Sequence, residues 1–271
     1  MRPYLSVLTG LLVALAPAYA QEKPAQHARV ELISQQSSIA AGTDALLGVH
    51  FVLDSGWHIY WVNPGDSGQP PSFKWNLPAG FSADEVQWPR PERMQAIKEL
   101  ADFGYHNDVL LPLTLHVPAS AKSSEEVAAD AKWLVCREVC IPEHKQLQLT
   151  LPVAAKAQLN PSTAGLFANT KKLLPKPLPH GWKTKVISTK DDFVLSITGT
   201  RQIAKAEFFP LDPGQIDNPS PQKAQPSGTG ITVTLKKSDL LVKPINVLRG
   251  VLVIPGNPPY QIEAPVHQPL Q

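Results

Sequence analysis

Residues 131–151, AKWLVCREVCIPEHKQLQLTL, decide the fold, and they hold the two cysteines of the chain, Cys136 and Cys140. The largely apolar run before the cysteines and the alternation of Leu147, Leu149 and Leu151 after them predict two β-strands, and three intervening residues are a common hairpin-loop length. In such a hairpin the cysteines face each other at a Cα separation that suits a disulfide. A helix also brings residues four apart together, so the spacing alone leaves both structures open.

The chemistry of this cysteine pair has three interpretations. A disulfide that closes so small a ring stabilises a domain by roughly 2 kcal/mol, and a domain with a core of its own does not need that contribution. A short-range pair at a loop tip is exposed and opens without unfolding the domain, which favours thiol–disulfide exchange. Arg137 and Lys145 favour a thiolate, whereas Glu138 and Glu143 oppose it. A redox-active pair, a structural hairpin disulfide and a pair of metal ligands therefore remain open.

Short segments of period-2 alternation continue outward from the hairpin and predict an all-β chain of two β-sandwiches. Turn signals rich in Gly, Pro, Asn and Asp separate them. In the first domain the expected strands are 28–33, 46–53, 111–117, 131–135 and 146–153. In the second they are 183–188, 193–198, 204–209, 231–235 and 249–253, and residues 217–230 are expected to form an exposed loop.

The two sandwiches are expected to be joined by a connector rich in proline and lysine. We expect a first domain over 21–155, a connector over 156–180 and a second domain over 181–271. Asn160, Pro161 and Ser162 are typical of a helix start, and the prolines at 175, 177 and 179 would end that helix. The connector is therefore predicted to contain one short helix.

The first 20 residues have the pattern of a cleaved secretory signal peptide. Arg2 gives a positive start, Leu5 to Ala16 is an apolar run too short for a comfortable membrane span, and Ala18-Tyr19-Ala20 is a small-x-small cleavage site. We expect cleavage after Ala20, an exported mature protein that does not insert into the membrane, and an oxidising compartment. The formal net charge of +2 argues against a nucleic-acid partner.

Three segments of the first domain resemble the periplasmic N-terminal region of DsbD/ScsB-type thiol:disulfide interchange proteins in motif, order and spacing. They are 57–68 (WHIYWVNPGDSG), 102–105 (DFGY) and 133–142 (WLVCREVCIP). The second module resembles the second immunoglobulin-like domain of the ScsB branch at 206–210 (AEFFP) and 248–252 (LRGVL). The resemblance covers nearly the whole mature chain and implies a periplasmic protein with two immunoglobulin-like β-sandwich domains.

The resemblance also implies a function. Cys136 and Cys140 fall on the family's redox pair, which accepts electrons from a membrane-embedded transporter and passes them to oxidised periplasmic thiol proteins. This would make the chain a thiol-disulfide oxidoreductase module with no cofactor beyond its disulfide. Because it ends at Gln271 without a membrane domain or a thioredoxin-like domain, we expect a stand-alone module whose electron source is another polypeptide. The alternatives are a non-catalytic binding or assembly module with a structural hairpin disulfide, and a copper-handling protein.

We expect two further sets of site residues, the cap of the redox pair and the neighbours of the pair. In the family a loop with an aromatic residue caps the redox pair, and the expected cap residues are Asp102, Phe103, Gly104 and Tyr105, with Phe103 or Tyr105 as the cap itself. The expected neighbours of the pair are His58, Tyr60, Arg137, Glu138 and His144. On an alternating strand His58 and Tyr60 share one face. The possible metal ligands are Cys136, Cys140, His144 and Met94. Their spacing does not match a common zinc pattern, so no metal is predicted.

Overall fold

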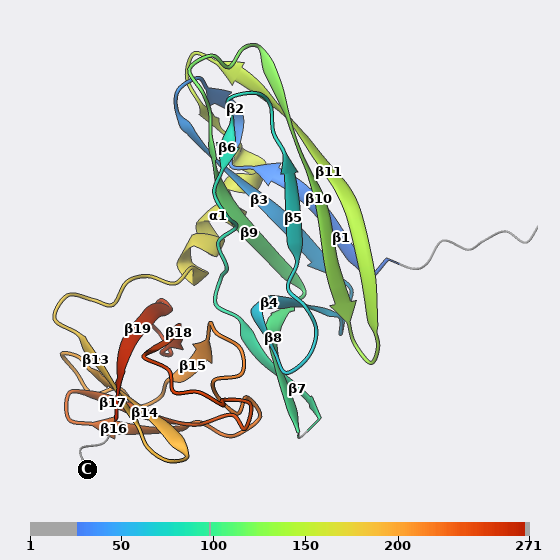
Figure 1. Cartoon of the computed structure of the whole chain (residues 1–271). Coiled ribbons are helices and arrows are strands. Elements are labelled where there is room, and N and C mark those ends of the chain that lie inside the picture. The colour runs from blue at the N-terminus through green and yellow to red at the C-terminus, as the bar shows by residue number, and fades with distance from the viewer. Residues whose placement is uncertain (1–25, 98, 269–271) are drawn as a thin grey trace, which may run out of the picture.

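Two β-sandwiches form the molecule, a long one from the first half of the chain and a shorter one from the second half (Figure 1). The computed structural model describes residues 26–97 and 99–268, so the expected signal peptide lies outside the described residues. The all-β class and the two immunoglobulin-like sandwiches expected from the sequence are confirmed. Within the described residues, no helix combines the length and apolarity that crossing a bilayer requires.

The first sandwich consists of two sheets that face each other. One has the order β1-β3-β9-β6, and the other has the order β12-β2-β11-β10-β4-β8-β7, with β5 also paired to β10. Its strands are β1 (Ala28–Ser34), β2 (Gln36–Ala40), β3 (Asp44–Leu53), β4 (His58–Gly65), β5 (Ser72–Asn76), β6 (Ser82–Ala83), β7 (Glu92–Ile97), β8 (Leu100–His106), β9 (Asp108–His116), β10 (Ser124–Cys136), β11 (Cys140–Ala154) and β12 (Gln158–Leu159).

The core of this sandwich follows the alternation of the sequence. In β1 every second residue is buried, as a strand with one face on a core requires. Phe51 of β3 is fully buried, and its ring meets the edge of Trp133 from β10 at a centroid distance of 5.6 Å. This contact ties the strand that ends in Cys136 to the opposite sheet.

The second sandwich has the strand order β15-β18-β19-β13-β14-β17-β16. Its strands are β13 (Lys183–Ser188), β14 (Asp192–Thr198), β15 (Glu207–Pro210), β16 (Lys223–Ser227), β17 (Gly230–Lys236), β18 (Val247–Val253) and β19 (Tyr260–His267). The prediction of a loop over 217–230 is wrong in part, because β16 lies within it. The strand contains Pro226, which a sheet accepts there because β16 lies at the end of the strand order.

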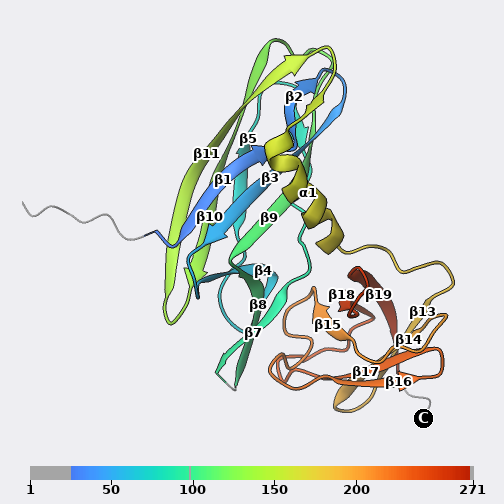
Figure 2. The same ribbon diagram turned by 180° about the vertical axis from the view of Figure 1, so that it is seen from behind.

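Helix α1 (Pro161–Leu173) lies between the two sandwiches in sequence and packs against the first one (Figure 2). The Asn160 side chain accepts a hydrogen bond from the Ser162 backbone N–H, and Pro161 occupies the first turn, where its missing N–H costs nothing. Phe167 is buried, and the Thr163 hydroxyl donates to the Ser34 carbonyl at 2.7 Å. The helix is therefore fixed to the first sandwich, which with β12 extends to Leu159, beyond the expected end at 155.

Truncation of Phe51 tests this description of the core. We expect Phe51→Ala to lower the free energy of unfolding by about 3–5 kcal/mol, because it leaves a cavity between the sheets. Val52→Ala is the matched control, since Val52 is the next residue, points to the other face of β3 and is only half-buried. Urea denaturation of both variants measures the difference, and equal losses would contradict the assignment of Phe51 to the central core.

Candidate functional site

Cys136 and Cys140 form a disulfide and are the closing residue pair of the β10–β11 hairpin. Their Cα atoms are 4.1 Å apart. The two strands pair in continuous register from Ser124–Pro152 to this pair. The expected hairpin is therefore confirmed, and the helical alternative for the cysteine spacing is excluded.

The two sulfur-bearing residues differ in exposure. Cys136 is only 1% exposed, because β11 and β4 flank it and His58 lies opposite it in the β4 register. Cys140 is exposed, and Val139 beside it in the loop is 64% exposed. Along the described residues β11 pairs with β2 only at Val153 and Ala154, so the outer edge of β11 near Cys140 carries no further strand. One end of the disulfide is thus inside the fold and the other faces solvent.

Tyr60 is an aromatic residue that contacts the disulfide. Its hydroxyl lies 3.5 Å from the Cys140 sulfur, and the residue is 1% exposed. A disulfide sulfur has no proton, so here the hydroxyl donates and the sulfur accepts. The His58 ring meets the Tyr60 ring edge-on at 5.3 Å. The expected placement of His58 and Tyr60 on one strand face, beside the cysteine pair, is what the structure has.

The protonation of these neighbours follows from their burial. Burial lowers the pKa of His58 below its usual 6.5, and nearby His106 lowers it further while Asp102 opposes the shift. Burial likewise raises the pKa of Tyr60 above 10.0. His58 is therefore neutral near pH 7 and Tyr60 keeps its proton. Among the residues that the structure describes, the buried His58 Nε2 atom has no hydrogen-bond partner, so a nitrogen that can accept or donate a proton lies on the sheet face of the disulfide.

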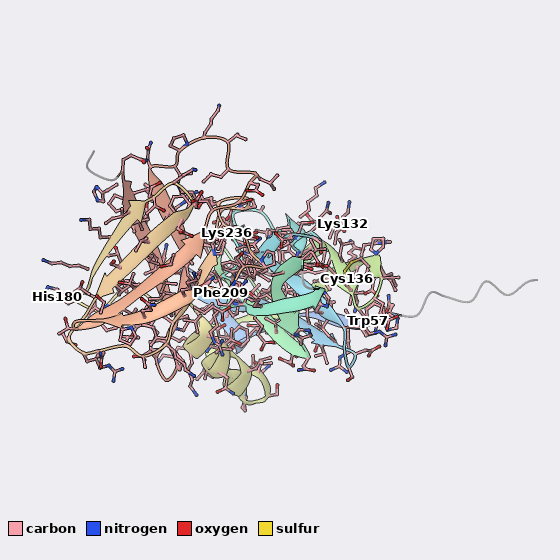
Figure 3. All side chains as sticks on the ribbon, turned by 90° about the horizontal axis from the view of Figure 1, so that it is seen from below. Trp57, Lys132, Cys136, His180, Phe209 and Lys236 are labelled. Atoms are coloured by element: carbon pink, nitrogen blue, oxygen red, sulfur yellow. A yellow bond between two sulfur atoms is a disulfide. The ribbon has the colours of Figure 1, made fainter. Side chains whose placement is uncertain are left out.

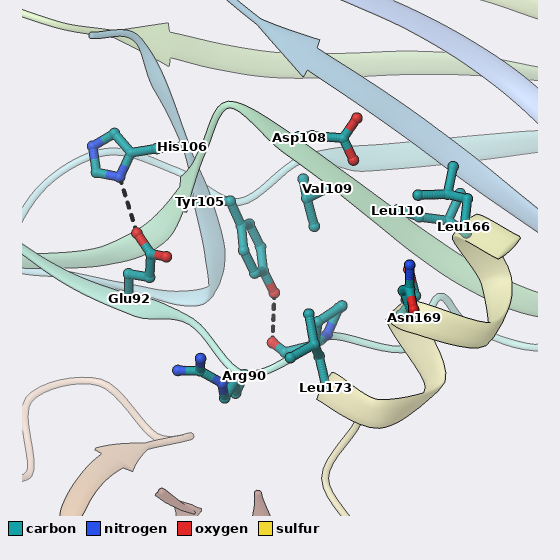
Figure 4. A pocket seen from close by; sticks show the side chains of 12 residues that line it. Arg90, Glu92, Tyr105, His106, Asp108, Val109, Leu110, Leu166, Asn169 and Leu173 are labelled. Carbon is teal, nitrogen blue, oxygen red and sulfur yellow. Dashed lines mark hydrogen bonds and ion pairs between the residues drawn. The ribbon is translucent and has the colours of Figure 1, made fainter. Parts of the chain in front are cut away.

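The expected cap loop at residues 102–105 is a strand, which corrects the sequence-based prediction. These residues belong to β8, and Tyr60 pairs with Gly104 while Ile59 pairs with Tyr105. Because side chains alternate across a strand, Phe103 and Tyr105 lie on the opposite sheet face from Tyr60 and the disulfide. The Tyr105 hydroxyl donates to the Pro89 carbonyl at 2.7 Å, in a pocket bordered by α1 (Figure 4).

Asp102 and Gly104 do lie on the disulfide face of β8, and each positions a neighbouring segment. Asp102 accepts hydrogen bonds from the Ser67 backbone N–H at 2.8 Å and from the Ser67 hydroxyl at 2.7 Å. A Cβ atom on Gly104 would lie 2.0 Å from the Ile59 carbonyl oxygen, so the close approach of β8 to β4 requires glycine here.

The segment that covers Tyr60 is the loop 66–71 between β4 and β5. Gly68 has a φ of +74°, and a Cβ atom there would lie 2.1 Å from Cζ of Tyr60, so the Gly68 backbone lies directly on the phenol ring. The sequence shows these residues only as a turn, and the packing of that turn on Tyr60 is a non-local contact that turn composition does not predict.

The remaining predicted neighbours differ in their distance from the sulfurs. Arg137 and Glu138 lie in the exposed loop between the cysteines, and the Arg137 guanidinium lies 5.3 Å from the centroid of the Trp57 ring. The sequence analysis did not assign Trp57 this contact. His144 faces the same side of β11 as Cys140 but lies four residues, about 14 Å, along the strand. In residues 26–97 and 99–268, no group of three or more His, Cys, Asp and Glu side chains is placed to hold a metal ion.

Comparison with known proteins connects this site to a family. Residues 29–152 match the family model described as thiol:disulfide interchange protein DsbD, N-terminal. This chain resembles the N-terminal region of DsbD/ScsB-type proteins. The matched DsbD-type segment contains the whole site described above, including both cysteines, Tyr60 and Asp102.

A solved structure is similar to this chain across both sandwiches. The N-terminal periplasmic domain of ScsB from Proteus mirabilis matches with a TM-score of 0.70 and 16% sequence identity, over 93% of this chain and 98% of that chain. The two proteins share the fold across both sandwiches. The sporulation control protein Spo0M from Bacillus subtilis, at 8% identity over 88% of this chain and 90% of that chain, has a TM-score of 0.23, which is too low to inform the function. No curated protein matches the chain.

Proton titration tests the electrostatics of the site. We expect an NMR titration to place the pKa of His58 below 6.5 and that of His116 above it, because Asp44 and Asp84 hydrogen-bond to His116. Unfolded His58 binds a proton more readily than folded His58, so its contribution to stability is present above pH 6.5 and is lost as the pH falls. Asp44→Asn is the control and should lower the pKa of His116 alone. A His58 titration at or above 6.5 would contradict the described burial.

Proposed function

We propose that this protein carries electrons by thiol–disulfide exchange through Cys136 and Cys140. The observation that supports the proposal most directly is the unequal exposure of the two cysteines at a hairpin tip, with Tyr60 over the outer sulfur. A bond in this position can be opened while the sandwich stays folded, which exchange requires. A five-residue ring adds only roughly 2 kcal/mol to stability, so stabilisation is a weak reason for the pair.

The exchange proceeds through a mixed disulfide. In the reduced protein the Cys140 thiolate attacks one sulfur of a partner disulfide, and the other partner sulfur leaves as a thiolate. The Cys136 thiolate then attacks the Cys140 sulfur, which closes the protein disulfide and releases the second partner sulfur. Two electrons pass to the partner, which ends as a dithiol. A dithiol donor reduces the Cys136–Cys140 bond again by the reverse sequence.

Neighbouring groups suit this chemistry. Neutral His58 lies opposite Cys136 in register and has a free buried nitrogen that can take up the Cys136 proton. The Tyr60 hydroxyl can donate to a Cys140 thiolate as it does to the disulfide sulfur. The positive Arg137 side chain lies in the loop between the two cysteines and favours the thiolate forms.

The resemblance to DsbD and ScsB supports a setting for the reaction. We propose a periplasmic protein, exported by the signal peptide at residues 1–20, that takes electrons from a membrane-embedded transporter of the DsbD/ScsB type. The receivers are oxidised periplasmic thiol proteins. A resident cofactor or metal is not needed, because the disulfide itself carries the electrons.

The exposure difference supports Cys140 as the attacking residue. We expect reduced Cys136→Ser to form a stable mixed disulfide with oxidised glutathione at least about ten times faster than reduced Cys140→Ser, because Cys136 is 1% exposed. Mass spectrometry of the adducts over time measures both rates. Equal rates, or a faster reaction at Cys136, would contradict the assignment of Cys140 as the attacker.

The reduction potential of the pair tests the function itself. Equilibration in dithiothreitol and glutathione buffers, with counting of free thiols, should give a potential in the range of about −120 to −270 mV that exchange proteins occupy. A bond that stays closed below about −300 mV would instead identify a structural disulfide. The protein would then be a binding or assembly module, and Cys136→Ser/Cys140→Ser would leave its partner association intact.

A further inference from the structure

The second sandwich packs against the sheet that bears the disulfide. Phe209 of β15 is 2% exposed and belongs to the apolar core of the first sandwich. Its ring meets Phe103 edge-on at 5.4 Å and Trp61 at 6.5 Å. Figure 3 shows Phe209 at the junction of the two sandwiches, with Cys136 on the first sandwich. Because Trp61 and Phe103 alternate with Tyr60 and Gly104, this contact lies on the sheet face opposite the disulfide.

Polar contacts fix the same junction. The Asn63 side chain donates to the Pro210 carbonyl at 2.8 Å, and Arg93 forms an ion pair with Glu207 at 2.7 Å. Arg93 also donates to the backbone carbonyl of Asn218. The two domains therefore meet through an apolar contact and directional bonds, which together hold one orientation of the second sandwich.

One of these contacts reaches the loop over Tyr60. The Asn218 side chain, in a residue that is 4% exposed, donates to Oδ1 of Asp66 at 2.8 Å. Asp66 is exposed, yet its Oδ2 also accepts from the Ala101 N–H at 2.8 Å. Asp66 begins the loop 66–71, two residues before Gly68. The second domain thus holds the start of the segment that lies on the Tyr60 ring.

We infer that the second domain controls access to the Cys140 sulfur through the contact between Asn218 and Asp66. A thiolate must approach a disulfide sulfur along the S–S axis. The Tyr60 hydroxyl contacts the Cys140 sulfur, the Gly68 backbone lies on the Tyr60 ring, and Asp66, which accepts from Asn218, comes two residues before Gly68. Loosening the Asn218 contact frees Tyr60 to move away. The physiological meaning rests on the proposed function, whereas the shielding itself acts on any attacking thiol.

The test is the rate at which dithiothreitol reduces the disulfide in the intact two-domain protein. A dithiothreitol thiolate attacks Cys140, and Cys136 leaves as a thiolate. The second dithiothreitol thiol, as its thiolate, then attacks the reagent sulfur of the mixed disulfide, which closes the oxidised ring of the reagent and releases Cys140 as a thiolate. We expect Asn218→Ala to be reduced about three to ten times faster than the unchanged protein, since it loses one hydrogen bond. Asn218→Asp should be faster still, because it places a carboxylate against that of Asp66.

Asn257→Ala is the matched control. Asn257 is a half-buried asparagine of the same domain whose side chain bonds to Arg201 and to the Pro255 carbonyl within that domain. Its reduction rate should equal that of the unchanged protein. Phe209→Leu, which keeps an apolar side chain at the junction, serves as a second test variant and should also be reduced faster. Hydrogen exchange at the Ser67 amide should rise in the fast variants only.

Each outcome decides the inference. Equal reduction rates for Asn218→Ala, Asn218→Asp, Phe209→Leu and Asn257→Ala, with unchanged Ser67 exchange, would overturn it. Faster reduction confined to the junction variants supports it, even if the potential of the pair lies below −300 mV and the proposed function fails. Conversely, a potential in the exchange range with equal rates retains the proposed function and removes the role of the second domain.

Discussion

The long register of β10 against β11 is the constraint on which the rest of the site depends. Pairing from Ser124–Pro152 onward leaves Cys136 and Cys140 opposite each other at the far end, with only three residues to turn the chain. The same register places β10 between β11 and β4, which buries Cys136 and leaves Cys140 at an edge. A shift of one residue would move every side chain of the hairpin to the other face and separate the sulfurs from Tyr60.

Because side chains alternate along β4 and β8, the two faces of this part of the sheet make different contacts. One face carries His58, Tyr60 and Asp102 toward the disulfide and its covering loop. The other face carries Trp61 and Phe103 toward the second sandwich. The strands β4 and β8 therefore contribute both to the surroundings of the disulfide and to the contact between the two domains.

Sequence patterns were sufficient for the parts of the structure that depend on neighbours along the chain. The hairpin, the strand at 183–188 and the helix start at Asn160 each have a local signal, and all three are present. The cap was misplaced because Phe103 could be assigned to a face only after its pairing with β4 and β7 was known. The contacts of Gly68 with Tyr60 and of Asn218 with Asp66 join distant segments, and no local pattern encodes them.

The burial of Cys136 has a consequence for the lifetime of a complex with a partner. In the proposed exchange, Cys136 resolves the mixed disulfide, and it lies in β10 directly opposite Cys140 in the hairpin. Its attack is intramolecular, so its effective concentration far exceeds that of any thiol in solution. In the proposed exchange, a partner bound to Cys140 is therefore released by the protein's own second cysteine, and the covalent complex is brief unless Cys136 is removed.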